Sequence, residues 1–299
     1  MFRMDSNTKP VVAAAIAQLV ERDKLEYGDL VREYIPEWDN YRAGFITIGQ
    51  LLSHTGGLQI SSLFLQPLME PSPEHPDAPT LQLEAARFGI VGAAVPPGDS
   101  YSYSNPGYNT LGALVEIASG KLLEDQLREA LYEPLGMADS YNHRKGHEVD
   151  GKLDRVGAVY YRRGNDGEWL QGGTPGGPVA YPFARASGGM ISTAWDYAIF
   201  CQMFLNRGVY DGVRYLQPET VELMTSPKIH IAGEGSESSY YGYGWRLADG
   251  TYRHGGSDGT NAWVDPERQI IGLVFTQTPR GRNPLDRFRQ LVNLSIEER

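Results

Sequence analysis

Cysteine, positive charge and long hydrophobic runs are scarce in this sequence. Among 299 residues there is one cysteine, Cys201, so a disulfide framework is excluded, and its apolar helical surroundings predict a buried, inert thiol. The 27 Lys and Arg residues are outnumbered by 37 Asp and Glu, and the net charge of -10 argues against nucleic acid or an anionic membrane as partner. No run of about 18 apolar residues occurs, so no membrane-spanning helix is expected.

A secretory signal is also missing from the first residues, which hold no basic segment followed by an apolar core and a small-residue cleavage site. As written, the chain is therefore expected to be cytoplasmic. A length of 299 residues, 41% of them hydrophobic, allows one large domain or two intertwined ones. The sequence leaves the oligomeric state open.

The hydrophobic pattern divides the chain into two regions, which we expect to form a single intertwined catalytic unit. Residues 1–185 are mainly helical, and residues 11–20 are apolar on nearly all sides, which predicts a buried helix. Residues 186–299 combine helices with an antiparallel sheet. The sheet is expected from four strand-like runs before a final helix: 240–248, 251–256, 261–266 and 270–277, with the helix at 283–297. The expected fold class is α+β.

Local signals define several element ends. Thr47 with Gln50 three residues later has the form of a capping box at the start of a short helix. Asn105 is expected to be the N-cap of a helix that ends at Gly120. Residues 156–172 predict a hairpin with an Asn-Asp-Gly turn.

Ser6 and Lys9 lie three residues apart at the start of the predicted buried helix, so their side chains share one face. A serine hydroxyl is a weak nucleophile until a base takes its proton, and a desolvated lysine can be that base. Amides at a helix N-terminus can also stabilise a developing oxyanion. Taken alone, however, an S-x-x-K tetrapeptide occurs often by chance.

Two further motifs supply partners for this pair. Tyr103 and Asn105 form a Y-x-N motif, and a phenol on a loop before a helix could hydrogen-bond Ser6 and Lys9 and relay a proton. The alternatives are a half-buried loop aromatic and a helix cap. A later strand contains His254, Gly255 and Gly256, and paired glycines let a ligand approach the backbone. The alternative there is a tight turn with a solvated histidine.

In this order, the motifs resemble those of the serine β-lactamase and penicillin-binding-protein superfamily. The closest similarity is to its class C-like branch, which includes carboxylesterases, D-stereospecific aminopeptidases and some acyltransferases. The resemblance covers nearly the whole chain, because further segments match the family's habits in the same order: 51–58, 96–112, 133–140, 186–208, 241–245 and 254–260. The family has the β-lactamase/transpeptidase-like fold.

The resemblance implies a role for each motif residue. Ser6 would be the acylated nucleophile, Lys9 its proton partner and Tyr103 the general base or acid. Which of Lys9 and Tyr103 takes the first proton stays open at this point. Backbone amides of Ser6 and Ser257 would form the oxyanion hole. The remaining substrate-contacting residues would be Asn105, His254, Gly255 and Gly256. No metal or cofactor is implied.

The chain departs from the family pattern in two ways. His254-Gly255-Gly256 replaces the family's K-T-G triplet, and a neutral imidazole binds a carboxylate less well than an ammonium group. This favours hydrolysis of small esters or amides over a β-lactam substrate, with a β-lactamase, a D-alanyl-D-alanine peptidase or a D-aminopeptidase as the alternatives. The family also has several dozen residues before S-x-x-K. We therefore expect the N-terminal strands of the sheet to be missing, and a truncated, non-catalytic or weakly active homologue is a further alternative.

Three other patterns are weaker. Ser257 occupies the serine position of G-x-S-x-G, but a strand-like run follows where a nucleophile elbow needs a helix. His143 and His147 are four residues apart beside Glu148, and since no third ligand is evident a solvated surface is expected there. His54 is interpreted as a structural residue that holds a turn.

Overall fold

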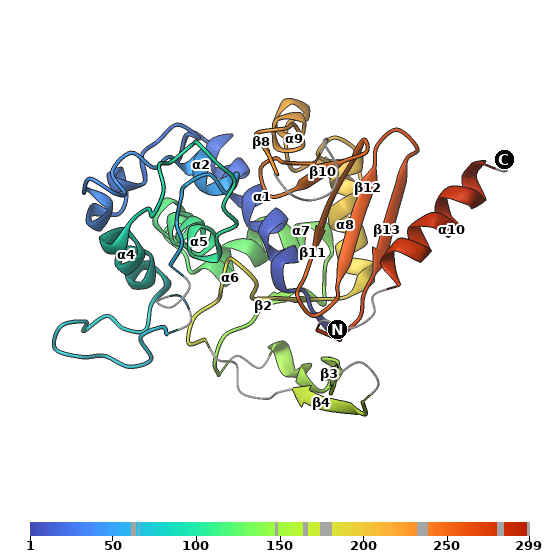
Figure 1. The fold of residues 1–299 in the computed structure, drawn as a ribbon, viewed down its shortest axis with the longest axis horizontal. Coiled ribbons are helices and arrows are strands. Elements are labelled where there is room, and N and C mark those ends of the chain that lie inside the picture. The colour runs from blue at the N-terminus through green and yellow to red at the C-terminus, as the bar shows by residue number, and fades with distance from the viewer. Residues whose placement is uncertain are drawn as a thin grey trace.

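The computed structural model describes residues 1–60, 64, 66–146, 149–163, 167–173, 181–231, 239–279 and 284–297. Figure 1 shows most helices gathered on one side of the molecule and a large antiparallel sheet on the other. Helix α1, Thr8–Val20, runs between these two parts. The arrangement is α+β, as the pattern of elements predicts.

Helix α1 is the central element of the core. Every residue from Thr8 to Leu19 is buried, which confirms the helix predicted from the all-round apolar run. A short 3₁₀ helix, Asp5–Asn7, precedes α1 directly, so Ser6 lies at the junction of the two helices.

The other helices of this part have mostly local start and stop signals. Thr47 and Gln50 form the predicted capping box of α2, and Gly120 ends α5 in the left-handed conformation. The expected N-cap at Asn105 is wrong: the Ser104 hydroxyl accepts the Gly107 N–H at 3.1 Å and is the cap. The bounds are α2 Ile48–Leu52, α4 Leu81–Val91, α5 Asn105–Ser119, α6 Leu123–Leu127, a π-helical turn Arg128–Tyr132, and α7 Glu133–Leu135.

The main sheet has six antiparallel strands in the order β13-β12-β11-β10-β9-β8. The four predicted strand-like runs are confirmed, and the first is split into β9 and β10. The bounds are β8 Ile229–His230, β9 Tyr240–Tyr241, β10 Arg246–Ala248, β11 Thr251–Gly255, β12 Asn261–Asp265 and β13 Ile270–Val274. Among the described strands, β13 has a neighbour only on its β12 side.

Helices cover both faces of this sheet. On one face, α8 (Ala194–Leu205) packs its Phe204 ring against Tyr252, and Cys201 of the same helix is buried as predicted. On the other face, Phe288 of α10 (Leu285–Glu297) contacts Trp263 at 5.9 Å between ring centroids. Trp263 pairs with Arg253, the residue directly after Tyr252. Since adjacent residues of a strand point to opposite faces of the sheet, Tyr252 and Trp263 lie on opposite faces.

Smaller elements complete the fold. A three-stranded sheet has the order β1-β5-β2, so the first strand pairs with β5 and not with the main sheet. The predicted hairpin is present as β3 and β4, while Asn165 and Asp166 of its turn lie outside the described residues. The bounds are β1 Phe2–Arg3, β2 Tyr141–Asn142, β3 Val159–Arg162, β4 Trp169–Gly173, β5 Met190–Ser192, β6 Val209–Tyr210, β7 Val213–Arg214 and α9 Pro218–Met224.

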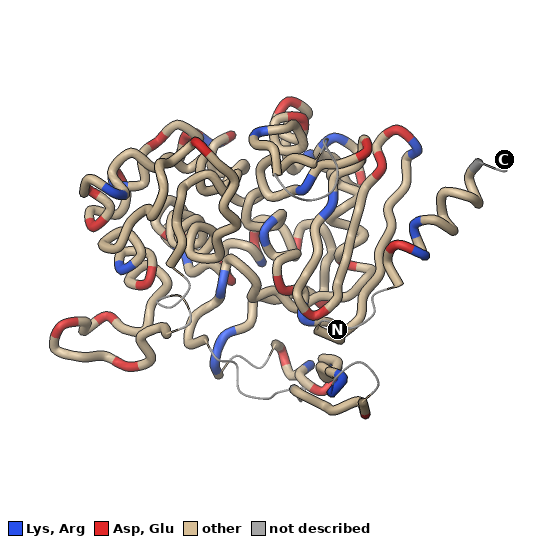
Figure 2. The backbone as a smooth tube through the Cα atoms, viewed as in Figure 1, with Lys and Arg blue, Asp and Glu red and all other residues tan. Residues whose placement is uncertain are grey.

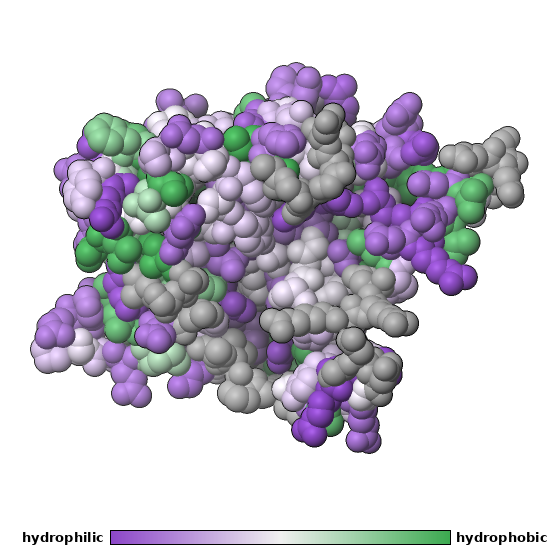
Figure 3. All heavy atoms as spheres, viewed as in Figure 1, coloured by the Kyte–Doolittle hydropathy of each residue, from purple (hydrophilic) through white to green (hydrophobic). Residues whose placement is uncertain are grey.

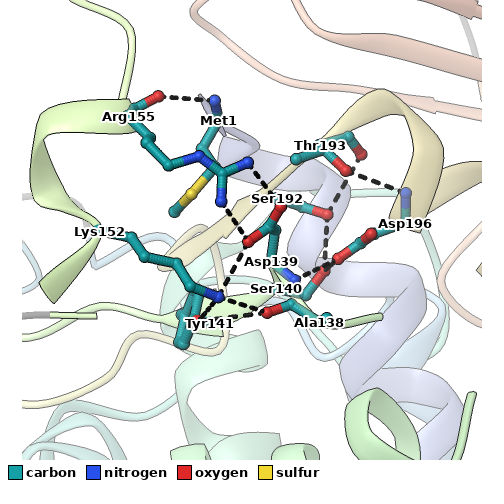
Figure 4. Close-up of polar contacts among 10 residues, drawn as sticks. All are labelled: Met1, Ala138, Asp139, Ser140, Tyr141, Lys152, Arg155, Ser192, Thr193 and Asp196. Atoms are coloured by element: carbon teal, nitrogen blue, oxygen red, sulfur yellow. Dashed lines mark hydrogen bonds and ion pairs between the residues drawn. The ribbon is translucent and has the colours of Figure 1, made fainter. Parts of the chain in front are cut away.

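A polar network ties the first residue to the segment after β2, as Figure 4 shows. The Met1 ammonium donates to the Arg155 carbonyl at 2.7 Å. The Arg155 guanidinium donates to both carboxylate oxygens of Asp139 at 2.7 Å each, and Lys152 donates to the same carboxylate at 3.0 Å. These cations hold the pKa of Asp139 below its ordinary value, with Arg155 as the largest cause.

We expect Asp139→Ala to lower the free energy of unfolding at pH 7 by about 1 kcal/mol. A bidentate ion pair within a network contributes more to stability than an isolated ion pair on the surface. The native pKa of Asp139 is depressed, so its contribution is present above the unfolded pKa and is lost as pH falls through the native pKa. Urea unfolding at pH 7 measures the loss of stability in the variant, and urea unfolding at acid pH measures how this difference depends on pH. The exposed Asp154→Ala is the control, and equal unfolding curves for the two variants would contradict the prediction.

The surface is mixed in charge and in hydropathy. Figure 2 shows Lys and Arg interspersed with Asp and Glu along the tube. Figure 3 shows hydrophobic side chains along α10, where Phe288, Leu291 and Leu294 are exposed. Among the described residues, no helix has the length and apolar character needed to cross a bilayer.

Candidate active site

Lys9 is the centre of the site and is 0% exposed. Its Nζ donates to Ser6 Oγ at 3.0 Å, to Asn105 Oδ1 at 2.9 Å and to the Ser187 carbonyl at 2.7 Å. An ammonium would donate to all three acceptors, whereas a neutral amine donates to two of them and keeps a lone pair for the Ser6 hydroxyl. No carboxylate of the described residues forms an ion pair with Lys9, so a charged Lys9 would be buried without a counter-ion.

The electrostatic environment of Lys9 favours the neutral amine. Burial lowers its pKa well below the ordinary lysine value, and the positive charges of Arg185 and Arg246 lower it further. The Asp5 carboxylate acts in the opposite direction. A lysine that loses its proton this readily can accept the proton of Ser6, whose hydroxyl is already within hydrogen-bond distance.

Tyr103 approaches the same pair from the loop before α5. The Ser6 side chain interacts with the Tyr103 hydroxyl and acts to lower its pKa, and Lys9 Nζ lies 4.6 Å from the centroid of the Tyr103 ring. Among the described residues no hydrogen bond joins this hydroxyl to Lys9, so the lysine contacts the ring alone. Burial raises the pKa of Tyr103, and the phenol therefore keeps its proton at neutral pH. At 38% exposed, Tyr103 stays accessible to a substrate.

The Y-x-N loop is held in place by its neighbours. Because Ser104 caps α5, the Asn105 amide is free of that task and accepts from Lys9 instead. His54 Nδ1 accepts the Ser104 N–H at 3.1 Å, and its ring lies 4.3 Å from that of Tyr103. His54 is 1% exposed, so the structural role predicted for it is confirmed and concerns the loop that carries Tyr103.

The H-G-G triplet lies at the end of β11. His254 is 4% exposed and turned into the core, where Nε2 is 3.0 Å from the Tyr241 hydroxyl and Nδ1 3.0 Å from the Gly255 carbonyl. Burial lowers its pKa well below the usual histidine value, so the ring is neutral at neutral pH. The Gly256 position has no room for a side chain, because a Cβ would collide with the Met4 carbonyl.

Ser257 follows in a tight turn beside the nucleophile. The turn is closed by the Gly259 N–H donating to the Gly256 carbonyl at 3.0 Å, and β12 begins at Asn261. No helix follows Ser257, which excludes the nucleophile elbow. Ser6 lies in the first turn of a helix, where a backbone N–H has no intrahelical acceptor.

The structure also adds site residues that the motifs do not identify. Ser187, Arg185 and Arg246 lie far from Ser6 in sequence, yet one accepts from Lys9 and the other two act on the Lys9 pKa. Ser187 lies in the segment 186–208 that resembles the family, whereas no local pattern marks Arg185 or Arg246. Asp5 precedes the nucleophile directly, and this adjacency was the only available signal for it.

Two features bear on ligands. A cavity of about 440 Å³ adjoins the end of β11, with Arg246, Ser257 and Trp263 in its lining. His147 and Glu148 lie outside the described residues, and those that the structure describes contain no group of three or more His, Cys, Asp or Glu able to hold a metal ion.

Comparisons with known proteins agree with this arrangement. The family model described as Beta-lactamase matches residues 1–294. Protein Rv1367c of Mycobacterium tuberculosis is 31% identical, over 93% of this chain and 77% of its own length. The N-acetylmuramyl-L-alanine amidase of Bacillus subtilis is 28% identical, over 92% of this chain and 67% of its own length.

The fold is also that of solved relatives. EstCE1, a hydrolase with promiscuous acyltransferase activity, superimposes with a TM-score of 0.74 at 21% identity, over 93% of this chain and 80% of its own. This likeness confirms the β-lactamase/transpeptidase-like α+β fold. The match over nearly the full length, together with the geometry of the motifs, shows that the chain belongs to the beta-lactamase family and is a serine hydrolase.

Proposed function

We propose that this protein hydrolyses small esters or amides through an acyl-Ser6 intermediate, as a carboxylesterase-like enzyme. One observation carries the proposal: the Ser6 hydroxyl lies 3.0 Å from a completely buried lysine amine that has no carboxylate partner among the described residues. A serine beside a base of lowered pKa is the usual arrangement of an activated nucleophile.

The geometry supports one order of proton transfers. Ser6 Oγ attacks the substrate carbonyl carbon while its proton passes to neutral Lys9. Lys9 is the better first proton acceptor because its lowered pKa favours the unprotonated amine, whereas the raised pKa of Tyr103 keeps the phenol protonated. Tyr103 then donates its proton to the leaving group and is left as a phenolate. In the second half, water gives a proton to this phenolate as it attacks the acyl-Ser6 carbonyl, and the Lys9 ammonium returns its proton to Ser6 Oγ as the acid leaves.

Backbone N–H groups of Ser6 and Ser257 are placed in this proposal as the oxyanion hole, which stabilises charge that develops only in the transition state. The Asn105 amide and the backbone of Gly255 and Gly256 are placed as substrate contacts. His254 has both ring nitrogens engaged within the protein. His254, which stands where the family has the K-T-G lysine, therefore offers no cation to a β-lactam carboxylate, and this supports an ester or amide substrate.

A second candidate is the hydrolysis of a β-lactam or of a D-alanyl peptide. The positive charges of Arg185 and Arg246, which act on Lys9, favour an anionic substrate group near the site. The name of the Bacillus subtilis relative, an amidase of a muramyl-alanine bond, also points to a substrate with a peptide-like amide.

A substrate panel separates these functions. We expect saturable hydrolysis of p-nitrophenyl acetate and butyrate, and slower turnover of a chromogenic cephalosporin and of a D-alanyl-D-alanine peptide. Faster turnover of the cephalosporin or the peptide would favour the second candidate. A cooperatively folded protein that turns over none of the four would support a non-catalytic homologue.

A further inference from the structure

Two segments at opposite ends of the chain are bonded to each other beside the nucleophile. The Thr260 hydroxyl donates to the Met4 carbonyl at 3.1 Å, and Asn7 Nδ2 donates to Thr260 Oγ1 at 3.0 Å. Asn7 and Thr260 are both completely buried. These contacts join the turn that carries Ser6 to the segment after β11, so the position of one depends on the other.

Asp5 makes the contact nearest to the reacting groups. Its Oδ2 accepts the Asp258 N–H at 2.8 Å. The Asp5 carboxylate therefore holds the backbone of the turn 256–259. The backbone N–H of Ser257 belongs to the residue directly before this anchored amide.

The backbone of Asp5 is unusual for its position. Its φ of +47° lies in the left-handed region, which costs a non-glycine residue about 1 kcal/mol. Asp249, with φ of +52°, adopts the same conformation in the exposed turn between β10 and β11. Asp5, in contrast, precedes the nucleophile, where strained residues serve function more often than folding.

The burial of Asp5 and the neighbouring Asp258 carboxyl group make an ionised Asp5 unfavourable for the stability of the fold. The positive charges of Arg3 and Arg185 lower the pKa values of both Asp5 and Asp258. Burial raises the pKa of Asp5, and burial together with Asp5 raises the pKa of Asp258 to about 6. Two carboxyl groups in one half-buried site oppose each other's ionisation.

We propose that Asp5 is a positioning residue for the oxyanion hole: its carboxyl group fixes the turn 256–259 so that the Ser257 N–H faces the carbonyl attacked by Ser6. This inference rests on the proposed function. An oxyanion hole acts on charge that exists only in the transition state. Loss of the Asp5 contact should therefore lower kcat and leave KM nearly unchanged.

Two substitutions separate the carboxyl contact from the backbone strain and from the charge. Asp5→Gly keeps the left-handed backbone but removes the acceptor, whereas Asp5→Asn removes the charge and keeps an acceptor for the Asp258 N–H. We expect Asp5→Gly to lower kcat about 10- to 100-fold, because a small displacement of the turn that carries the Ser257 N–H weakens its contact with the transition state. Asp5→Asn should keep kcat within about 3-fold of wild type, and Asp249→Gly is the matched control.

Hydrogen exchange of the peptide covering 254–262 provides a readout that does not need activity. Exchange should be faster in Asp5→Gly than in wild type and unchanged in Asp5→Asn and Asp249→Gly. Equal exchange in all four proteins would overturn the proposal, as would equal kcat values for the Gly and Asn variants. If the wild type hydrolysed no substrate, the proposed function would fail by itself, and the exchange data alone would decide whether Asp5 holds the turn.

Discussion

Ser6→Ala should abolish hydrolysis of p-nitrophenyl esters, with a loss of kcat/KM of about 10⁴-fold or more, because no other described group occupies the nucleophile position. The physical reason is that acyl transfer through Ser6 is the whole reaction path in the proposed mechanism. A fluorophosphonate should add one covalent label to the wild type and none to Ser6→Ala. Intact-mass analysis measures this directly.

Ser257→Ala is the matched control for this experiment. Ser257 is a serine beside the same site, but its proposed contribution is its backbone N–H, which alanine retains. The control should be labelled like the wild type. Labelling of Ser6→Ala, or loss of labelling in Ser257→Ala alone, would show that Ser6 is not the nucleophile.

Lys9→Met should lower kcat/KM about 10³-fold, since methionine fills a similar volume and cannot take the Ser6 proton. The same variant should also reveal what Lys9 costs the fold. The pKa of Lys9 in the folded protein is lowered. The Lys9 side chain therefore binds a proton more readily in the unfolded state than in the folded state.

The sign of the stability change follows from proton binding. Between the folded pKa of Lys9 and its ordinary value, the unfolded state binds more protons, so wild-type stability rises with pH, by about 1.4 kcal/mol per unit. Lys9→Met lacks this dependence. Urea unfolding of both proteins at pH 7, 8 and 9 should show the wild type gaining stability relative to the variant. A constant difference across that range would mean that Lys9 is not shifted.

Residues with local causes were predicted from the sequence. The all-round apolar run before Glu21 defines α1. Thr47 with Gln50 forms the capping box of α2, because both partners lie within one helical turn. The same reasoning failed at Asn105. Both Ser104 and Asn105 are good capping residues, and the choice between them depends on where the Lys9 amine lies, which no local pattern encodes.

The orientation of the H-G-G triplet also could not be predicted from the sequence. The two glycines were expected to admit a ligand, yet at Gly256 the close approach is made by the Met4 carbonyl of the same chain. His254 could face either solvent or core from its strand position. The buried Tyr241 hydroxyl, supplied by another strand, is what holds it inside.

By itself the sequence determined the α+β class, the order of the three motifs, and the shared face of Ser6 and Lys9, because helical periodicity acts over three or four residues. The tertiary structure decided which of these groups can react. The lowered pKa of Lys9 comes from complete burial and from distant arginines. The contact between Asp5 and Asp258 joins residues 253 positions apart. Desolvation and long-range hydrogen bonds depend on packing of the whole chain, and no local pattern contains them.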